Sequence, residues 1–234
     1  PEGNRGRMSA YLLSPGVTLV LVVPIDKAAP KGRLILTQQQ TIRDILEADA
    51  FSLVVRDTGL KAALGQLREK PRLVVTDSQA FKKVAADTPE DSPLTSFSSL
   101  FARYKGELLP MVQGVKALDG IQDGDRILIC EGCTHHRQCD DIGTVKMPGW
   151  IRAYTGASPD FAFVSGTEFP EDLSPYRMIV HCGGCMLNAR EMRYRLQCAQ
   201  DQGVPMTNYG MTIAHTQGIL KRSLEPFEEL RGIL

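Results

Sequence analysis

Short, continuous apolar runs recur along the chain, separated by turn residues and by segments of mixed polarity. Such runs predict strands that are buried on both faces, as in parallel sheets. In the first part of the chain they lie at residues 17–23, 51–55 and 73–75. The segments that follow them place apolar residues three and four positions apart, which is helical spacing. These helices are predicted at residues 38–48, 57–67 and 78–85.

The same alternation returns after residues 86–92, a mostly polar stretch with Pro89 that is typical of a linker. Further strands are predicted at residues 126–130, 161–164, 178–180 and 205–208. Further helices are predicted at residues 97–104, 148–154, 188–202, 211–220 and 225–230. We therefore expect an α/β protein with two small parallel-sheet, Rossmann-like domains and covering helices. The expected division is a leader at residues 1–15, a first domain at 16–86 and a second domain at 93–234.

Composition narrows the function classes. The 234 residues carry 27 basic and 27 acidic side chains, and this balance argues against a nucleic-acid-binding or polybasic membrane-binding protein. The apolar run at residues 17–23 is far shorter than the ~20 residues that a membrane span needs. No signal peptide is visible, so we expect the reducing cytoplasm. Six cysteines are too few for a disulfide-stapled secreted scaffold, and their clustering is typical of metal binding.

Two cysteine-rich motifs directly follow predicted strands. The strand at 126–130 leads into EGCTHH at 131–136, and the strand at 178–180 leads into HCGGC at 181–185. Because the carboxyl ends of parallel strands share the ligand-binding edge of a sheet, we expect both motifs to converge there. Thiolates suit zinc or iron–sulfur clusters. An ordinary cubane takes four thiolates, so three leave one position for a histidine, a carboxylate, a water or an incoming ligand.

Cys182 and Cys185 are the strongest candidate metal ligands. Their Cys-x-x-Cys spacing also suits a redox dithiol, but the adjoining His181 and the distant Cys-x-His pair favour a metal. Cys133 is either the third ligand or a buried thiol after a strand. His135 and His181 each either occupy the open position or only tune the centre through hydrogen bonds.

The remaining candidates are weaker. Glu131 is a possible oxygen ligand, although a solvated acid is the default, and Asn208 and Tyr209 end a strand where they could line the site. Cys139 either reaches the site or packs at the start of the next segment. The other residues are expected to have structural or surface roles: Cys130, Cys198, His136 and His215.

The double motif resembles one family, the FeFe-hydrogenase maturation scaffold HydF. The pattern is Cys-x-His, then 45 residues, then His-Cys-x-x-Cys. Flanking segments agree: PID at 24–26, PKGRL at 30–34, CDDIG at 139–143, KMPGWI at 146–151 and TNYG at 207–210. The resemblance covers nearly the whole chain. It implies a 4Fe–4S cluster held by Cys133, Cys182 and Cys185, with His135 or His181 near the exchangeable position.

The resemblance also implies a function. Family members are scaffolds and carriers rather than enzymes. They assemble the diiron subcluster precursor, with its carbon monoxide, cyanide and dithiolate ligands, from components that radical-SAM maturases supply. They then deliver it to apo FeFe-hydrogenase. Family members usually begin with a GTP-binding domain, but this chain contains no Gly-x-x-x-x-Gly-Lys-Ser/Thr loop. We therefore expect a form without that domain and carry over no GTP-binding residue.

Two other functions fit the same residues. Cys133, His135, Cys182 and Cys185 would make a Cys₃His zinc site in a protein-interaction module. The Cys-x-x-Cys pair alone would suit a dithiol oxidoreductase. Independently of the chemistry, residues 16–86 are expected to form a homodimer, because a small parallel sheet has a small core and open edges.

Overall fold

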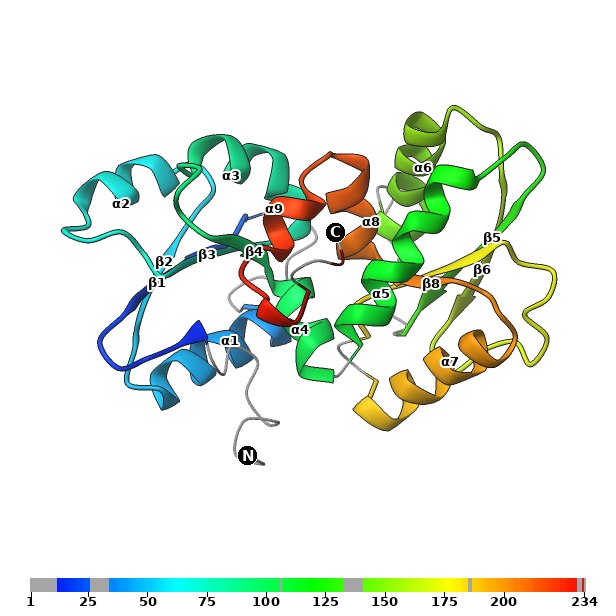
Figure 1. The fold of residues 1–234 in the computed structure, drawn as a ribbon, viewed down its shortest axis with the longest axis horizontal. Helices are drawn as coiled ribbons and strands as arrows, with labels where there is room; N and C mark the ends of the chain where they lie inside the picture. Colours follow the sequence, from blue (N-terminus) through cyan, green and yellow to red (C-terminus); the bar gives the residue numbers. More distant parts are fainter. Residues whose placement is uncertain are drawn as a thin grey trace. The chain divides into compact units, whose positions relative to one another are not determined.

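The computed structural model describes residues 12–25, 34–105, 107–132, 141–184, 187–230 and 233. Contacts divide the chain into two compact units, residues 1–104 with 217–234, and residues 105–216. Each unit contains a four-stranded, fully parallel sheet with helices on its faces (Figure 1). The predicted α/β class with two parallel-sheet domains is therefore confirmed.

The sheet of the first unit has the strand order β2-β1-β3-β4. Its strands are β1 Thr18–Val22, β2 Phe51–Val55, β3 Leu73–Thr76 and β4 Leu94–Ser96. Helix α1 covers one face, and α2 and α3 cover the other (Figure 1). The helices that begin in this unit are α1 Leu36–Glu47, α2 Leu60–Gln66, α3 Phe81–Asp87, α4 Phe97–Lys105 and α9 Leu220–Leu224, with short 3₁₀ turns at Ser78–Ala80 and Glu228–Leu230. The central strands β1 and β3 are buried, which explains their unbroken apolar sequences.

The division between the units does not lie at the expected linker, residues 86–92. Strand β4 follows that stretch and pairs with β3, with Val74 opposite Leu94 and Thr76 opposite Ser96. It therefore completes the first sheet, and the division lies between residues 104 and 105. Residues 217–234 also return to the first unit. There the Arg222 guanidinium donates to the carbonyl oxygens of residues 85, 88 and 89 at 2.7–2.8 Å.

The sheet of the second unit has the order β6-β5-β7-β8. Its strands are β5 Arg126–Glu131, β6 Asp160–Ser165, β7 Met178–His181 and β8 Met206–Asn208. Helices α5, α6 and α8 lie on one face and α7 lies on the other (Figure 1). These helices are α5 Leu108–Val115, α6 Met147–Thr155, α7 Ala189–Asp201 and α8 Tyr209–Thr216, with a 3₁₀ turn at Lys116–Gly120 and a π turn at Ile142–Lys146.

The predicted helix at 211–220 is in fact two shorter helices. Helix α8 begins directly after β8 and ends at Thr216, where the chain leaves the second unit, and α9 begins four residues later in the first unit. The predicted helix at 225–230 is reduced to the 3₁₀ turn at Glu228–Leu230. Across the described residues, no helix has both the length and the apolar character that crossing a bilayer requires.

Candidate metal centre

The two cysteine motifs begin side by side at the carboxyl edge of the second sheet. Strands β5 and β7 pair in parallel, with Cys130 opposite His181. The Cys182 amide donates to the Cys130 carbonyl oxygen at 2.8 Å, which extends this pairing by one residue. The starts of both motifs are thus in direct contact, as their positions after parallel strands predicted. The other parts of the motifs, including Cys133, His135, His136, Cys139 and Cys185, lie outside the described residues.

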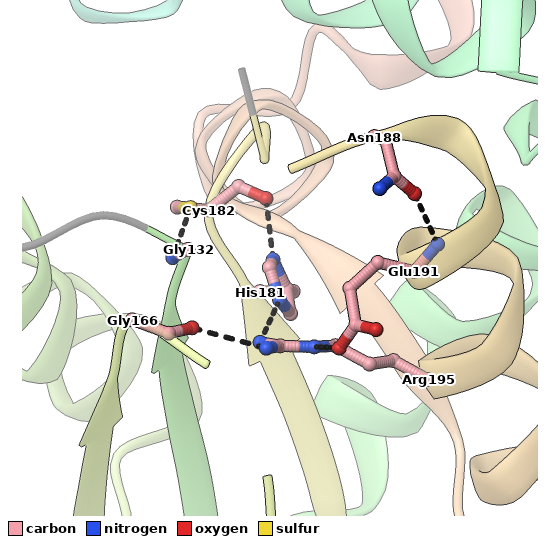
Figure 2. Close-up of polar contacts among 7 residues, drawn as sticks. All are labelled: Gly132, Gly166, His181, Cys182, Asn188, Glu191 and Arg195. Atoms are coloured by element: carbon pink, nitrogen blue, oxygen red, sulfur yellow. Dashed lines mark hydrogen bonds and ion pairs between the residues drawn. The ribbon is translucent and has the colours of Figure 1, made fainter. Parts of the chain in front are cut away.

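Two backbone amides surround the Cys182 sulfur. Gly132 N lies 3.0 Å from Sγ (Figure 2). Gly184 N lies 3.3 Å from the same sulfur. Donors aimed at sulfur stabilise the thiolate, which is the form that binds metals. Cys182 is half-buried at the sheet edge. One of the expected thiol ligands therefore has the surroundings that a metal-bound thiolate needs.

Both donor positions require glycine. Gly184 has φ +59°, and a Cβ there would lie 2.6 Å from Met192 Sδ. A Cβ on Gly132 would lie 2.8 Å from Leu187 Cδ1 and 3.4 Å from the Gly184 Cα. At contacts this short either the backbone or the side chains of Met192 and Leu187 would have to move. The glycines of the motifs thus allow two segments of backbone to approach one thiol closely.

The His181 side chain is fully buried, and both of its ring nitrogens have hydrogen-bond partners. Its Nδ1 lies 2.7 Å from the Cys182 carbonyl oxygen, and its Nε2 lies 3.1 Å from Arg195 Nη1 (Figure 2). Because arginine can only donate, Nε2 accepts and Nδ1 carries the proton. Burial lowers the pKa of His181 to about 4, despite its hydrogen bond to the carbonyl. The ring is therefore neutral, with both nitrogens engaged.

Arg195 joins three elements behind the Cys182 turn, which we define as residues 181–184. It projects from α7 and is fully buried. Besides His181, its guanidinium donates to Glu191 Oε1 at 2.9 Å and to the Gly166 carbonyl oxygen after β6 at 3.0 Å (Figure 2). Asn188 begins α7 by accepting a hydrogen bond from the Glu191 amide at 2.8 Å. These contacts position the arginine, and through it the His181 ring.

A second buried cation holds the other side of this turn. Lys105, at the end of α4, is 6% exposed. Its Nζ donates to the Gly184 carbonyl oxygen at 2.5 Å and to the Leu187 carbonyl oxygen at 3.2 Å. No sequence pattern pointed to Lys105, because it lies 79 residues from Gly184. The spacing of Glu191 and Arg195 is a visible i,i+4 helical pair, but nothing in it points to His181.

Two polar side chains, Glu131 at the end of β5 and Tyr209 at the start of α8, both lie next to Gly143. Gly143 leaves room for the Glu131 carboxylate and the Tyr209 hydroxyl, since a Cβ there would overlap both. The Tyr209 hydroxyl is buried and has no hydrogen-bond partner among the described residues. Burial and the nearby charge of Glu131 raise its pKa, so the phenol stays neutral. Asn208 caps α8 by accepting from the Met211 amide at 2.8 Å, which is a structural role.

The remaining described candidates have packing or hydrogen-bonding roles of their own. Cys130 is buried within β5, and burial raises the pKa of its thiol to about 12. Cys198 is half-buried on α7. His215 Nε2 lies 2.8 Å from Asp119 Oδ1 and 3.1 Å from the Tyr154 hydroxyl, so it links α8 to α6 and to the turn before β5. These are the packing and structural roles that their sequence positions indicated.

The described residues around Cys182 are chemically compatible with a metal bound through its thiolate. Among the described residues there is no group of three or more potential His, Cys, Asp or Glu ligands, and Cys182 is the described member of the predicted set. Its sulfur has two amide donors, and Lys105 and Arg195 place positive charge behind the turn. Thiolates and the clusters that they bind are negatively charged. This donor set is therefore chemically suited to an iron–sulfur cluster or to zinc.

Comparison with known proteins identifies the family. Residues 8–106 match the hydrogen maturase F dimerization domain, and residues 110–226 match the hydrogen maturase F tetramerization domain. No curated protein matches the chain. Among solved structures, an NtrC family transcriptional regulator from Clostridium acetobutylicum is 9% identical over 89% of this chain and 98% of that chain. Its TM-score of 0.27 is too low to indicate a shared fold. With both matched domains named for self-association, the chain belongs to the hydrogen maturase F (HydF) family.

Proposed function

We propose that this protein is a scaffold that binds a 4Fe–4S cluster through Cys133, Cys182 and Cys185. The protein carries the diiron subcluster precursor of FeFe-hydrogenase during its assembly and then delivers it to the apo-enzyme. This precursor has carbon monoxide, cyanide and dithiolate ligands. Radical-SAM maturases supply the components. The observation that carries this proposal is the Cys182 sulfur, which receives two amide donors where β5 and β7 end.

The two amide donors also connect the three cysteines. Gly132 and Gly184 immediately precede Cys133 and Cys185 in the sequence, and both reach the Cys182 sulfur. Membership of the hydrogen maturase F family supports a role in hydrogenase maturation. When bound, the cluster supplies an iron atom with an exchangeable position to which a bridging group of the precursor can attach. The chain's own residues bind the cluster and orient the Cys182 turn, and this role requires no catalytic group.

The exchangeable position is assigned to His135 or to an outside ligand rather than to His181. Both ring nitrogens of His181 are engaged, one with the Cys182 carbonyl and one with Arg195. A ligand role would require the ring to leave a fully buried position and two hydrogen bonds. We therefore propose that His181 orients the turn. Adding cyanide or imidazole to the reduced wild-type protein and to His135→Ala should change the electron paramagnetic resonance spectrum, and an unchanged spectrum in both would contradict an open position.

Metal analysis tests the cluster itself. The wild-type protein, reconstituted without oxygen, should contain iron and acid-labile sulfide in equal amounts. Cys133→Ala, Cys182→Ala and Cys185→Ala should each lose most of this iron, whereas Cys198→Ala should keep it, because that thiol is away from the site on α7. Full iron in Cys182→Ala would refute the assignment. Zinc without sulfide would instead support a Cys₃His module, and a reversible dithiol without metal would support an oxidoreductase.

Self-association is proposed to use the first unit. In the described residues, β2 is an edge strand that pairs with β1. Phe51 is 61% exposed and Val54 is 43% exposed on this strand. An open edge with apolar side chains is suited to pairing with a second copy, which would satisfy its backbone groups and cover both side chains. We propose that the homodimer forms through this edge.

A further inference from the structure

Three consecutive peptide groups define the backbone of the Cys182 turn. The carbonyl of the first accepts a hydrogen bond from His181 Nδ1 at 2.7 Å. The amide of the second, on Gly184, points at the Cys182 sulfur at 3.3 Å. The carbonyl of the third, also on Gly184, accepts from Lys105 Nζ at 2.5 Å. The peptide group that donates to the sulfur therefore lies between two anchored carbonyls, one held by the His181 ring and the other by Lys105.

Two of the four residues in the turn, Gly183 and Gly184, have no side chain that could hold this conformation. Glycine also has the largest backbone freedom of any residue. A trans peptide is planar, so fixing a carbonyl oxygen also fixes the amide attached to the same plane. Anchoring the Cys182 and Gly184 carbonyls thus restricts the rotations that would otherwise turn the Gly184 amide away from the sulfur. Arg195 supplies the first anchor through His181, and Lys105 supplies the second directly.

The anchors also bring charge. Arg195 is fully buried and Lys105 is 6% exposed, so water screens neither cation well. Arg195 donates to one carboxylate, Glu191, and to two neutral acceptors. Lys105 donates to two neutral carbonyl oxygens, and its charge also acts on the buried carboxyl of Glu107. Buried positive charge favours the more negative form of a nearby group, which here means a thiolate over a thiol and a reduced cluster over an oxidised one.

We propose that Arg195, acting through His181, and Lys105 are positioning residues that hold the Cys182 turn in its thiolate-binding conformation and favour the reduced cluster. This inference rests on the proposed cluster-binding function for its redox part. Its anchoring part concerns the polypeptide alone. The two parts can therefore be tested separately, and failure of one can be distinguished from failure of the other.

The anchoring part is tested on metal-free protein by nitrogen-15 NMR of the histidine ring. In the wild type, the His181 signal, assigned with His181→Gln, should show a proton on Nδ1 and an acceptor at Nε2. Arg195→Met should abolish this pattern, because Nε2 loses its donor. Arg193→Met is the matched control, since Arg193 is exposed on the same helix and donates to the Ala189 carbonyl oxygen within that helix. An unchanged ring signal in Arg195→Met would overturn the anchoring role.

The charge part is tested on reconstituted protein by redox titration with dithionite, monitored by electron paramagnetic resonance. Arg195→Met and Lys105→Met should each contain at least threefold less reduced cluster than the wild type at the same applied potential. Arg195→Lys keeps the positive charge but replaces the planar guanidinium, which bonds to three acceptors at once. This variant should therefore bind less iron, while the cluster that remains should keep the wild-type potential. Equal iron loading and equal potential in all three variants would overturn the inference.

The test remains decisive if Arg195→Met does not fold or if the wild type binds no iron. If Arg195→Met does not fold, as judged by circular dichroism, Arg195→Lys and Lys105→Met decide the question with the same measurements. If the wild type binds no iron, the proposed function fails, whereas the NMR experiment still decides whether Arg195 positions His181. A potential that becomes less negative in Lys105→Met would refute the electrostatic argument even if iron loading falls as expected.

Discussion

Replacing Glu107 with glutamine should change how the stability of the second unit depends on pH. Glu107 precedes α5 and is 2% exposed. Its Oε1 has no hydrogen-bond partner among the described residues. Burial raises the pKa of this carboxyl from its ordinary value of 4.5 to about 7, although the positive charges of Lys105 and Arg193 act in the opposite direction. The folded protein therefore holds a proton that the unfolded chain releases.

The sign and the magnitude follow from this difference. Below pH 4.5 the carboxyl is protonated in both states, and the folded state has its full stability. As the pH rises through about 7, the unfolded chain has already lost its proton, so the folded state loses stability relative to it. A shift from 4.5 to about 7 corresponds to about 3 kcal/mol, at roughly 1.4 kcal/mol for each pH unit. Glu107→Gln removes this term and keeps the shape of the side chain.

Urea unfolding of metal-free protein at several pH values measures the effect. The single tryptophan, Trp150, is half-buried on α6 of the same unit, and its fluorescence follows the unfolding of that unit. At pH 4.5 the wild type and Glu107→Gln should be about equally stable. At pH 8 the variant should be more stable by up to about 3 kcal/mol. Glu168→Gln, which removes an exposed carboxyl from the same unit, should show no such divergence.

A difference between wild type and Glu107→Gln that does not change with pH would refute the reasoning. So would a difference that grows toward acid, because it would mean that the folded state favours the charged carboxylate. The first result would indicate that water or a change in local structure compensates for the burial. The second would indicate that Lys105 and Arg193 outweigh the burial.

Two further predictions follow from the geometry. Gly184→Ala should destabilise the protein by about 1–3 kcal/mol more than Gly203→Ala in urea unfolding. Both glycines have positive φ, but only a Cβ at Gly184 would collide with Met192. Equal losses of stability would contradict this packing argument. Phe51→Lys should convert a dimer into a species near 25.8 kDa by light scattering, whereas Phe163→Lys, at the edge of the other sheet, should not. A wild-type mass near 25.8 kDa at every concentration would remove the dimer altogether.

The central strands and the edge where the motifs meet were determined by the sequence alone. The runs at 126–130 and 178–180 correspond to Arg126–Glu131 and Met178–His181, because a parallel strand covered on both faces must be apolar at every position. Once two such strands are parallel, their carboxyl ends necessarily share an edge. Placing Cys182 beside the start of the other motif therefore needed no knowledge of the packing.

The extent of each unit was decided by the tertiary structure. Strand β4 has three residues, too few to show a period, and it is a strand because β3 offers it an open edge. The apolar spacing at 211–220 is continuous in the sequence, yet the chain changes units within it. Periodicity records which positions are buried, but not against which sheet they are buried.

The surroundings of Cys182 show the same limit at the level of single side chains. The sequence placed His181 next to Cys182 but left open whether its ring is a ligand or a hydrogen-bonding partner. Arg195, 14 residues later, occupies one ring nitrogen, and Lys105, 79 residues before Gly184, holds the other side of the turn. The direction in which a ring or a peptide group points depends on partners that only packing brings within hydrogen-bonding distance. Strand order brings the cysteine motifs together, and the packing of α7 and the end of α4 orients the turn that joins them.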